Sequence, residues 1–414
     1  MEIEYIHFYV EDAKAWCRWF VKILGFEVVN DYTFPYELIC KDTKQQFDTY
    51  TEVVKSGSVC FVLSSPLLPT SPVAEFLRYH PPGVADVAFA IDDIEDTLAR
   101  AQIHGAKVLQ PQYIYINNGV FFKCSKIAAW GSLSHTLIEE VGSRDWGVGE
   151  DRGEGGDKGD EGDRGGKGDK GDKGDKGDKG ENSSSFSSPP SPPSPPSPPT
   201  PYSLLPTPLT SIDHIVLNVA AGELEHAVAW YEKILDFQPQ QMFNIQTEYS
   251  ALHSRVMISQ DRKVQIPINE PATPNSQIQE FLNFNQGAGI QHIALRSHNL
   301  IDTIAQFRTH NLPFLAVPNT YYSQLVNRPG FPLSPADMDA MAKQEILVDW
   351  QENCPSALLL QIFTQPIFGQ PTFFFEFIER RNLAKGFGEG NFRALFEAIE
   401  REQLKRGSLK GSRE

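Results

Sequence analysis

The sequence predicts an α+β fold made of two related domains, each built from paired βαβββ modules and joined to the other by a linker. Two observations lead to this prediction. The first and last parts of the chain repeat the same order of apolar segments, and the stretch between them differs sharply in composition. We therefore expect an N-terminal domain over 1–142, a disordered linker over 143–209, and a C-terminal domain over 210–414 that ends in a helix.

Each half is expected to begin with a strand, followed by an amphipathic helix and several short strands. In the N-terminal half the strand spans 6–10 and the helix 13–24, and in the C-terminal half they span 215–219 and 224–235. A second strand and helix follow in each half, so each domain holds two modules. The repeat is clearest where residues 19–26 match 230–237, 83–89 match 289–295, and 96–99 match 302–305.

The linker has two parts of different composition. Glycine occupies every third position from Gly153 to Gly180, which is the collagen period, but the positions between carry only charged residues and no proline. A segment without apolar side chains cannot offset its ordering entropy, so we predict disorder there. The Pro-Pro-Ser repeats that follow predict a stiff polyproline II spacer.

Charge and hydropathy exclude several function classes. The chain has 37 basic and 53 acidic residues, a formal charge of −16, which argues against binding a phosphate backbone as the main activity. No apolar run reaches the ~18 residues of a membrane span, and the N-terminus lacks a basic signal-peptide start. The five scattered cysteines contain no CxxC pair and indicate neither a disulfide framework nor a thiolate metal site. We expect a cytoplasmic protein without nucleic-acid or membrane partners.

One carboxylate stands in a strand-like segment that is apolar on both faces. Glu376 lies within 372–378, where alternation places phenylalanines on each side of the strand. An ionised carboxylate buried there costs several kcal/mol unless a cation pairs with it. Arg380 and Arg381 are the simplest partners. A metal becomes the better explanation if neutral imidazoles converge on the same point.

Two histidines in similar strand contexts offer that convergence. His214 lies in 211–217 and His292 in 289–295. Each alone is more commonly a hydrogen-bonded core histidine. Two histidines and one carboxylate with open positions suit a non-haem Fe(II) site that activates oxygen, whereas structural zinc takes four ligands.

The repeat also indicates which half is active. The N-terminal half has other residues at the three corresponding places, so we expect it to bind no metal and to serve structure or assembly. His214 falls opposite Tyr5, His292 opposite Asp86, and Glu376 near Leu137.

The C-terminal half contains six distinctive motifs: DHIV at 213–216, PINEP at 267–271, SQIQ at 276–279, GAGIQHIAL at 287–295, LQIFT at 360–364 and GFGEGNFRALF at 386–396. These motifs resemble those of the 4-hydroxyphenylpyruvate dioxygenase family, within the vicinal oxygen chelate superfamily. The resemblance is close over 210–407 and looser over 1–142. The insert at 143–210 has no counterpart in that family.

The resemblance implies two fused vicinal-oxygen-chelate domains and an Fe(II) enzyme that converts an arylpyruvate and O2 to homogentisate and CO2. Tyrosine catabolism or the supply of prenylquinone precursors would be its context, and a homo-oligomer its assembly. His214, His292 and Glu376 would bind the iron. The α-keto acid would then be both chelator and reductant.

The resemblance also assigns a substrate pocket with amide and aromatic walls. Alternation supports Gln361, which shares a face with Phe363, whereas a regular strand would turn Gln291 away from His292. Surface amides and core phenylalanines are the ordinary alternatives. The polar lining would be Ser254, Asn269, Gln277, Gln291 and Gln361, beside Pro267. The remaining wall would be Phe363, Phe374, Phe387, Asn391, Phe392 and Leu395. Of these residues, the resemblance gives catalytic roles to Gln277, Gln291, Gln361, Phe363 and Phe392.

The last helix follows a glycine-rich loop. Asn391 is placed to cap this helix, and its apolar positions fall on one face. The helix is either docked permanently or forms a lid over the metal.

Two other functions stay open. A 4-hydroxymandelate synthase would share the fold, the metal ligands and the substrate but hydroxylate the benzylic carbon. A non-catalytic module that binds an arylpyruvate or a metal would have no need for open positions on iron.

Overall fold

A computed structural model describes residues 1–29, 48–117, 119–142 and 208–409. Almost all of the predicted linker over 143–209 lies outside these residues, so that prediction is not tested. The described part of the N-terminal half contains β1 (Glu2–Tyr9), α1 (Ala13–Leu24), β2 (Glu27–Val28), β3 (Thr49–Ser56), β4 (Val59–Pro66), α3 (Pro72–Tyr79), β5 (Gly83–Ala90), α4 (Ile94–Ile103), β6 (Val108–Asn117), β7 (Val120–Ala128) and β8 (Ser134–Gly142).

The C-terminal half repeats this order and adds helices before and after its last strands. It contains β9 (Ser211–Asn218), α5 (Leu224–Leu235), β10 (Gln238–Gln246), β11 (Ala251–Ile258), β12 (Gln265–Pro271), α6 (Gln277–Asn285), β13 (Gly289–Arg296), α7 (Leu300–Thr309), α8 (Asn319–Leu325), α9 (Pro335–Lys343), β14 (Leu347–Gln351), β15 (Cys354–Phe363), β16 (Phe374–Arg380), a 3-10 turn (Arg381–Leu383) and α10 (Glu389–Arg406).

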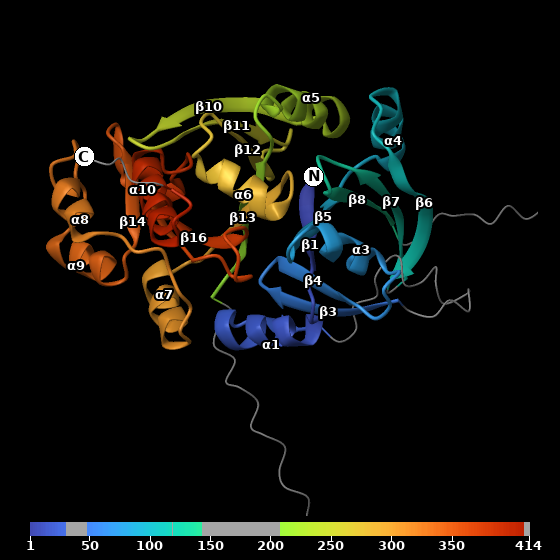
Figure 1. Cartoon of the computed structure of the whole chain (residues 1–414), viewed down its shortest axis with the longest axis horizontal. Helices are drawn as coiled ribbons and strands as arrows, with labels where there is room; N and C mark the ends of the chain where they lie inside the picture. The colour runs from blue at the N-terminus through green and yellow to red at the C-terminus, as the bar shows by residue number, and fades with distance from the viewer. Residues whose placement is uncertain (30–47, 118, 143–207, 410–414) are drawn as a thin grey trace, which may run out of the picture. The chain divides into compact units, whose positions relative to one another are not determined.

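Each half forms one eight-stranded sheet with the same strand order (Figure 1). The N-terminal order is β2-β3-β4-β1-β5-β8-β7-β6, and the C-terminal order is β10-β11-β12-β9-β13-β16-β15-β14. Two βαβββ modules meet at the antiparallel pair β1–β5, or β9–β13. The prediction of two fused domains with paired modules is confirmed. Among the described residues, no helix is long and apolar enough to cross a membrane.

The first helix of each half has the predicted bounds, and its ends show why. Asp12 accepts a hydrogen bond from the Ala15 N–H, which caps α1 at its N-terminus. The helix ends at Gly25, whose φ of 70° suits glycine. In the C-terminal copy Asp236 takes the same left-handed conformation with a φ of 58°.

A shared apolar core lies behind the strand that carries Glu376. Phe373 and Phe375 are buried on the face opposite to that carboxylate. Their rings contact phenylalanines of the N-terminal half, with centroids 5.2 Å apart for Phe8–Phe373 and 5.8 Å for Phe61–Phe375. Because each buried phenylalanine contributes ~1.5–3 kcal/mol, this core ties β16 firmly to the N-terminal sheet.

A buried hydrogen bond also joins the two halves. The His135 Nδ1–H donates to the Val87 carbonyl at 3.1 Å, so its Nε2 accepts from the Tyr231 hydroxyl at 3.0 Å. Burial lowers the pKa of His135 to about 4. The imidazole therefore stays neutral at physiological pH.

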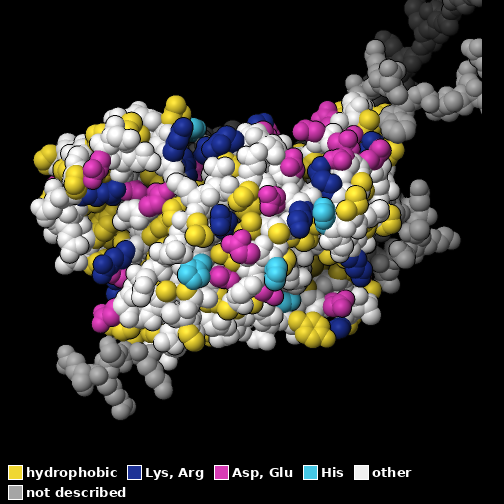
Figure 2. All heavy atoms as spheres, turned by 90° about the horizontal axis from the view of Figure 1, so that it is seen from above, with side chains coloured by type: hydrophobic (Ala, Val, Ile, Leu, Met, Phe, Trp, Pro, Cys, Tyr) yellow, Lys and Arg dark blue, Asp and Glu magenta, His cyan; other side chains and the backbone are white. Residues whose placement is uncertain are grey.

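Charged side chains of both signs lie interspersed among uncharged ones on the face shown in Figure 2. A surface of this kind has no broad positive area that could follow a phosphate backbone.

Candidate metal centre

Three adjacent strands bring His214, His292 and Glu376 together. Ala294 of β13 pairs with His214 of β9 on one side and with Glu376 of β16 on the other, so these three residues form one row across the sheet. His292 lies two positions before Ala294 and points to the same face. The small side chain of Ala294 leaves the space into which the two ligands of the row lean.

The distances fit a common ion. The Oε2 of Glu376 lies 3.1 Å from the Nε2 of His214 and 3.7 Å from the Nε2 of His292. One ligand atom of each residue lies within 4.8 Å of the others. Ligand atoms bound at ~2.1 Å to a single ion are ~3 Å apart at right angles, so small adjustments suffice. The Glu376 side chain is only 2% exposed.

Neither nearby arginine neutralises Glu376. Arg380 instead forms a two-pronged pair with Asp213, at 2.7 Å to each carboxylate oxygen, and Arg381 pairs with Glu379. The buried carboxylate thus faces two imidazoles and no guanidinium, which is the arrangement expected of a metal ligand.

Asp213 also orients the first histidine. The Nδ1–H of His214 donates to Asp213 Oδ1 at 3.0 Å, which directs Nε2 toward Glu376. Burial disfavours the charged form of His214, but the nearby carboxylates of Glu376 and Asp213 outweigh this effect and raise the pKa of His214 to about 9. Burial is likewise outweighed at Asp213, where Arg380 and His214 hold the pKa well below its usual range. Burial and the charge of His214 lower the pKa of His292.

A β-bulge explains how Gln291 and His292 both reach the cavity. Between Ile290 and His292 of β13 the partner strand advances by one residue, from Leu217 to Val216, so Gln291 is the extra residue. A regular strand would turn Gln291 away. The bulge brings its Oε1 to 3.4 Å from the Nδ1 of His292.

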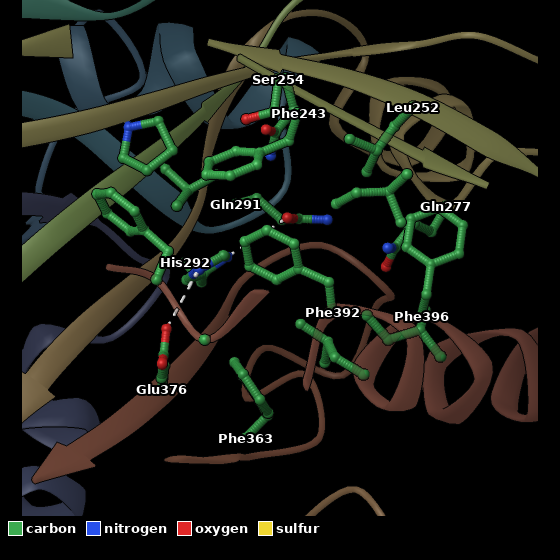
Figure 3. Close-up of a pocket in the computed structure, with 18 of the residues that line it drawn as sticks. Phe243, Leu252, Ser254, Gln277, Gln291, His292, Phe363, Glu376, Phe392 and Phe396 are labelled. Atoms are coloured by element: carbon green, nitrogen blue, oxygen red, sulfur yellow. Dashed lines mark hydrogen bonds and ion pairs between the residues drawn. The ribbon is translucent and has the colours of Figure 1, made fainter. Parts of the chain in front are cut away.

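The three residues line one cavity, and Figure 3 shows His292 and Glu376 on the side of it opposite Gln277. Every residue that the sequence assigned to the pocket lines this cavity: Ser254, Pro267, Asn269, Gln277, Gln291, Gln361, Phe363, Phe374, Phe387, Asn391, Phe392 and Leu395, together with His214, His292 and Glu376. Its lining contains no lysine or arginine.

The pocket amides differ in the groups they have available. Gln361 uses both N–H groups of Nε2, donating to Glu376 Oε1 and to the Phe387 carbonyl, each at 2.9 Å. The Oε1 of Gln277 is buried without a partner among the described residues. An unsatisfied buried acceptor costs ~1–3 kcal/mol, so Gln277 is ready to accept a hydrogen bond from a ligand.

Helix α10 closes one side of the cavity, but Asn391 does not cap it. The helix begins at Glu389 after Gly388, and Asn391 is its third residue, 1% exposed. Its Nδ2 donates to Gln361 Oε1 at 2.9 Å. The capping prediction is wrong because Gly388 has a φ of 80° and its Cα lies so near Gln361 that any Cβ would collide there. The turn therefore ends at a glycine and the asparagine points inward.

The corresponding place in the N-terminal half holds no metal-binding set. The strand register puts Tyr5, Ala88 and Thr136 in one row, as the counterparts of His214, Ala294 and Glu376. Asp86 stands where His292 does, and it accepts hydrogen bonds from Ser134 at 2.6 Å and Thr136 at 2.7 Å.

Several lining residues were not assigned from the sequence. Alternation along β9 and β11 could have indicated Val216, Leu252 and Val256, which share faces with His214 and Ser254. Phe243 and Ile245 alternate with Asn244 along β10 in the same way. The unassigned residues are Val216, Phe243, Ile245, Leu252, Val256, Ile278, Gly388, Phe396 and Ile399.

Comparisons with known proteins agree with the fold. Residues 4–122 and 211–327 each match the model of the glyoxalase/bleomycin resistance protein/dioxygenase superfamily. A mutant of 4-hydroxymandelate synthase from Streptomyces coelicolor has the same fold, with a TM-score of 0.70, 24% identity and coverage of 97% of this chain and 98% of the other. The fold and the site thus define a two-domain protein of this superfamily.

Full-length relatives narrow the assignment. The 4-hydroxyphenylpyruvate dioxygenase of Coccidioides posadasii is 34% identical over 98% of this chain and 94% of its own length, and that of Caenorhabditis elegans 32% over 98% and 93%. An uncharacterized protein of Synechocystis sp. is 32% identical over 97% of both chains. The chain belongs to the 4-hydroxyphenylpyruvate dioxygenase family.

Proposed function

We propose that this enzyme is an Fe(II)-dependent dioxygenase that converts 4-hydroxyphenylpyruvate and O2 to homogentisate and CO2. One observation carries the proposal: a buried carboxylate and two imidazoles share one end of a cavity whose other walls are aromatic rings and uncharged amides. The ligand set is that of non-haem iron oxygenases. The walls suit a phenol ring, because amides can donate and accept hydrogen bonds without placing a charge beside it.

His214, His292 and Glu376 would hold the iron. When bound, Fe(II) supplies open positions for a chelating α-keto acid and O2, together with an electron source for reducing O2. The protein's contribution is to fix the ligands. Asp213 orients His214, Gln361 donates to Glu376, and Phe374 stacks on the His292 ring with centroids 4.7 Å apart.

The charge distribution of the cavity favours one substrate orientation. With no lysine or arginine in the lining, the anionic keto acid is best stabilised at the metal end. The phenol is then directed toward the distant polar groups, among which Gln277 has an unpaired acceptor for the hydroxyl proton. Asn269 and Ser254 are paired across β11–β12 and line the same cavity.

Helix α10 would exclude water during the reaction. Phe392, Leu395, Phe396 and Ile399 lie along its cavity side, and all four line the pocket. In Figure 3, Phe392 and Phe396 project from this helix into the cavity. Opening and closing of the helix would admit the substrate and release the product, as lids do in other enzymes.

The second candidate reaction is the formation of 4-hydroxymandelate, which the likeness in fold to a 4-hydroxymandelate synthase brings into consideration. The named sequence relatives over the full length favour the dioxygenase instead. A non-catalytic binding module is disfavoured because the metal ligands leave coordination positions open.

Product analysis distinguishes these possibilities. The purified chain, loaded anaerobically with Fe(II), is given 4-hydroxyphenylpyruvate while O2 uptake and CO2 release are followed. Homogentisate and 4-hydroxymandelate have the same mass, so they must be separated by chromatography against standards. We expect one O2 consumed per homogentisate. Mainly 4-hydroxymandelate would refute the proposed product, and no O2 uptake by iron-loaded protein would refute the proposed activity. Light scattering would check the predicted homo-oligomer.

A further inference from the structure

We propose that Tyr321 is a positioning residue for the metal carboxylate Glu376, and that it acts through Asn391 and Gln361. This inference rests on the proposed metal site. The Tyr321 hydroxyl donates to Asn391 Oδ1 at 2.8 Å, and Asn391 Nδ2 donates to Gln361 Oε1 at 2.9 Å. Gln361 Nε2 then donates to Glu376 Oε1 at 2.9 Å. Three hydrogen bonds thus connect helix α8 with the metal centre, and all of them point toward the carboxylate.

The direction of this chain is set at its carboxylate end and is completed by its first donor. A side-chain amide can present either its oxygen or its NH2 group to a neighbour, so neither Gln361 nor Asn391 has a fixed orientation by itself. Glu376 accepts only, which requires the NH2 of Gln361 and leaves Gln361 Oε1 to accept from Asn391. Asn391 Oδ1 then needs a donor. Tyr321 provides it.

The environment of Tyr321 prepares its hydroxyl for this role. The hydroxyl oxygen accepts from the Val348 N–H at 2.8 Å, so its single proton points away from that group. Two acceptors lie within reach of this proton, Asn391 Oδ1 at 2.8 Å and the Val348 carbonyl at 3.0 Å. Without the hydroxyl, Asn391 Oδ1 would lose its donor, and Asn391 would be held less firmly against Gln361 Oε1. Gln361, and through it Glu376, would then be less tightly fixed in place.

The same chain holds the first turn of α10. Asn391 belongs to that turn, and Gln361 also donates to the Phe387 carbonyl in the loop before it. Next to them, the Gly390 N–H donates to Asp349 Oδ2 at 3.1 Å. Docking of α10 and fixing of Glu376 therefore share one set of hydrogen bonds. Because coupling between two binding events is reciprocal, metal binding should order α10 and docked α10 should strengthen metal binding.

The neighbouring tyrosine offers a matched control. Tyr322 lies on the same helix, is buried, and donates its hydroxyl proton to the Ile346 carbonyl at 3.0 Å. It has no contact with Asn391 or Gln361 among the hydrogen bonds of the described residues. Tyr321→Phe and Tyr322→Phe each remove one hydroxyl and one donated hydrogen bond, and Tyr321→Phe also removes the acceptor of the Val348 N–H. Only Tyr321→Phe removes the donor of the chain.

The decisive measurement is the affinity for metal, titrated anaerobically with Fe(II) and separately with Co(II). We expect Tyr321→Phe to weaken binding of both ions about tenfold, the lower end of the range for groups that orient metal ligands. Tyr322→Phe should bind both ions as the wild-type chain does, although it should also melt at a lowered temperature because it loses a buried hydrogen bond. Equal affinities in the two variants would overturn the inference.

Hydrogen exchange of the α10 amides tests the coupling without turnover. Metal loading should slow exchange at Asn391 and Phe392 in the wild-type chain and in Tyr322→Phe, and much less in Tyr321→Phe. The same protection by metal in all three proteins would contradict the coupling. If only the proposed reaction is wrong, the wild-type enzyme will give another product, but the difference in metal affinity between Tyr321→Phe and Tyr322→Phe will persist. A wild-type chain that binds neither ion would overturn both.

Discussion

Replacing Glu376 by glutamine tests whether the buried carboxylate is there to bind a metal. The amide has nearly the same shape, and its oxygen can still accept from Gln361 Nε2, which lies 2.9 Å from Glu376 Oε1. Packing against the apolar core behind β16 is therefore unchanged. What disappears is the negative charge that faces His214 at 3.1 Å and His292 at 3.7 Å.

The expected magnitude follows from the loss of that charge. Removing one partner of a buried charge pair costs ~3–5 kcal/mol. At ~1.4 kcal/mol per factor of ten, Glu376→Gln should weaken metal binding by at least about two orders of magnitude. A metal present at 100 times the wild-type Kd stabilises that protein by ~2.7 kcal/mol, but it would stabilise the variant by only ~0.4 kcal/mol. Without metal, Glu376→Gln also removes the charge that helps to raise the pKa of His214, so the variant loses some stability there too. The stabilisation that metal adds is therefore the quantity to compare.

Two assays separate these effects. Metal content after dialysis against a weak chelator reports affinity, and denaturant unfolding with and without Fe(II) reports stability. Asp86→Asn is the matched control, because it neutralises a buried carboxylate at the corresponding place of the other sheet. That control should keep its metal, as should a variant that replaces His7. Full metal retention by Glu376→Gln would refute the reasoning and return Glu376 to a structural role.

Four further predictions concern other parts of the molecule. Replacing 153–199 by a plain flexible linker of adequate reach should leave the rate at saturating substrate nearly unchanged, because this segment contains no metal ligand; a severe loss in soluble, iron-loaded protein would contradict this. Phe392→Ala should loosen the ring and raise O2 uptake without product, since a ~1 Å misplacement can lower a rate about a hundredfold; unchanged coupling of O2 to product would exclude a role in holding the ring. Ala294→Val should weaken metal binding about tenfold by crowding the space between the ligands, whereas Ala88→Val in the other sheet should weaken it not at all; equal metal affinity in both would disprove this. The pKa of His135 is lowered to about 4, against ~6.5 in the unfolded chain. The unfolded state therefore takes up the proton first, so this group has no effect above pH 6.5 and lowers the free energy of unfolding by up to ~3 kcal/mol as the pH falls to 4. Urea unfolding across that range should show a smaller pH slope for His135→Gln, and an equal slope would contradict the assignment.

The sequence predicted those features that depend on local pattern. The bounds of α1 and α5 follow from amphipathic periodicity and from end signals such as Asp12 and Gly25. Glu376 was identifiable because a single charge in an apolar strand must have a partner. Comparison of the two repeats then indicated that the metal site lies in the C-terminal half, because the N-terminal half has other residues at the three corresponding positions. The internal repeat also predicted the two sheets, since each copy has the same order of elements.

Other features depend on contacts between distant segments and left no local signal. The bulge at Gln291 arises from the pairing of β13 with β9, so alternation alone assigns this residue to the wrong face. Asparagine is a residue type favoured at helix N-caps, but the Asn391 amide instead forms hydrogen bonds with Gln361 and Tyr321, which lie 30 and 70 residues away in the sequence. The contact between Phe243 of β10 and Phe392 of α10, with ring centroids 5.0 Å apart, likewise joins segments that no local pattern connects.

The N-terminal half supports the metal centre although none of its described residues lines the cavity. Its sheet has the same strand arrangement, with Ala88 in the place of Ala294. The two halves therefore differ in the side chains at the ligand positions and not in their architecture. Strand β16 carries Glu376 on one face and buried phenylalanines on the other, and those phenylalanines contact rings of the N-terminal half. A carboxylate that must meet two imidazoles to within a fraction of an ångström requires a strand that cannot shift. The core behind β16 provides that rigidity, and part of this core comes from the copy in which the structure shows no metal-ligand set among its described residues.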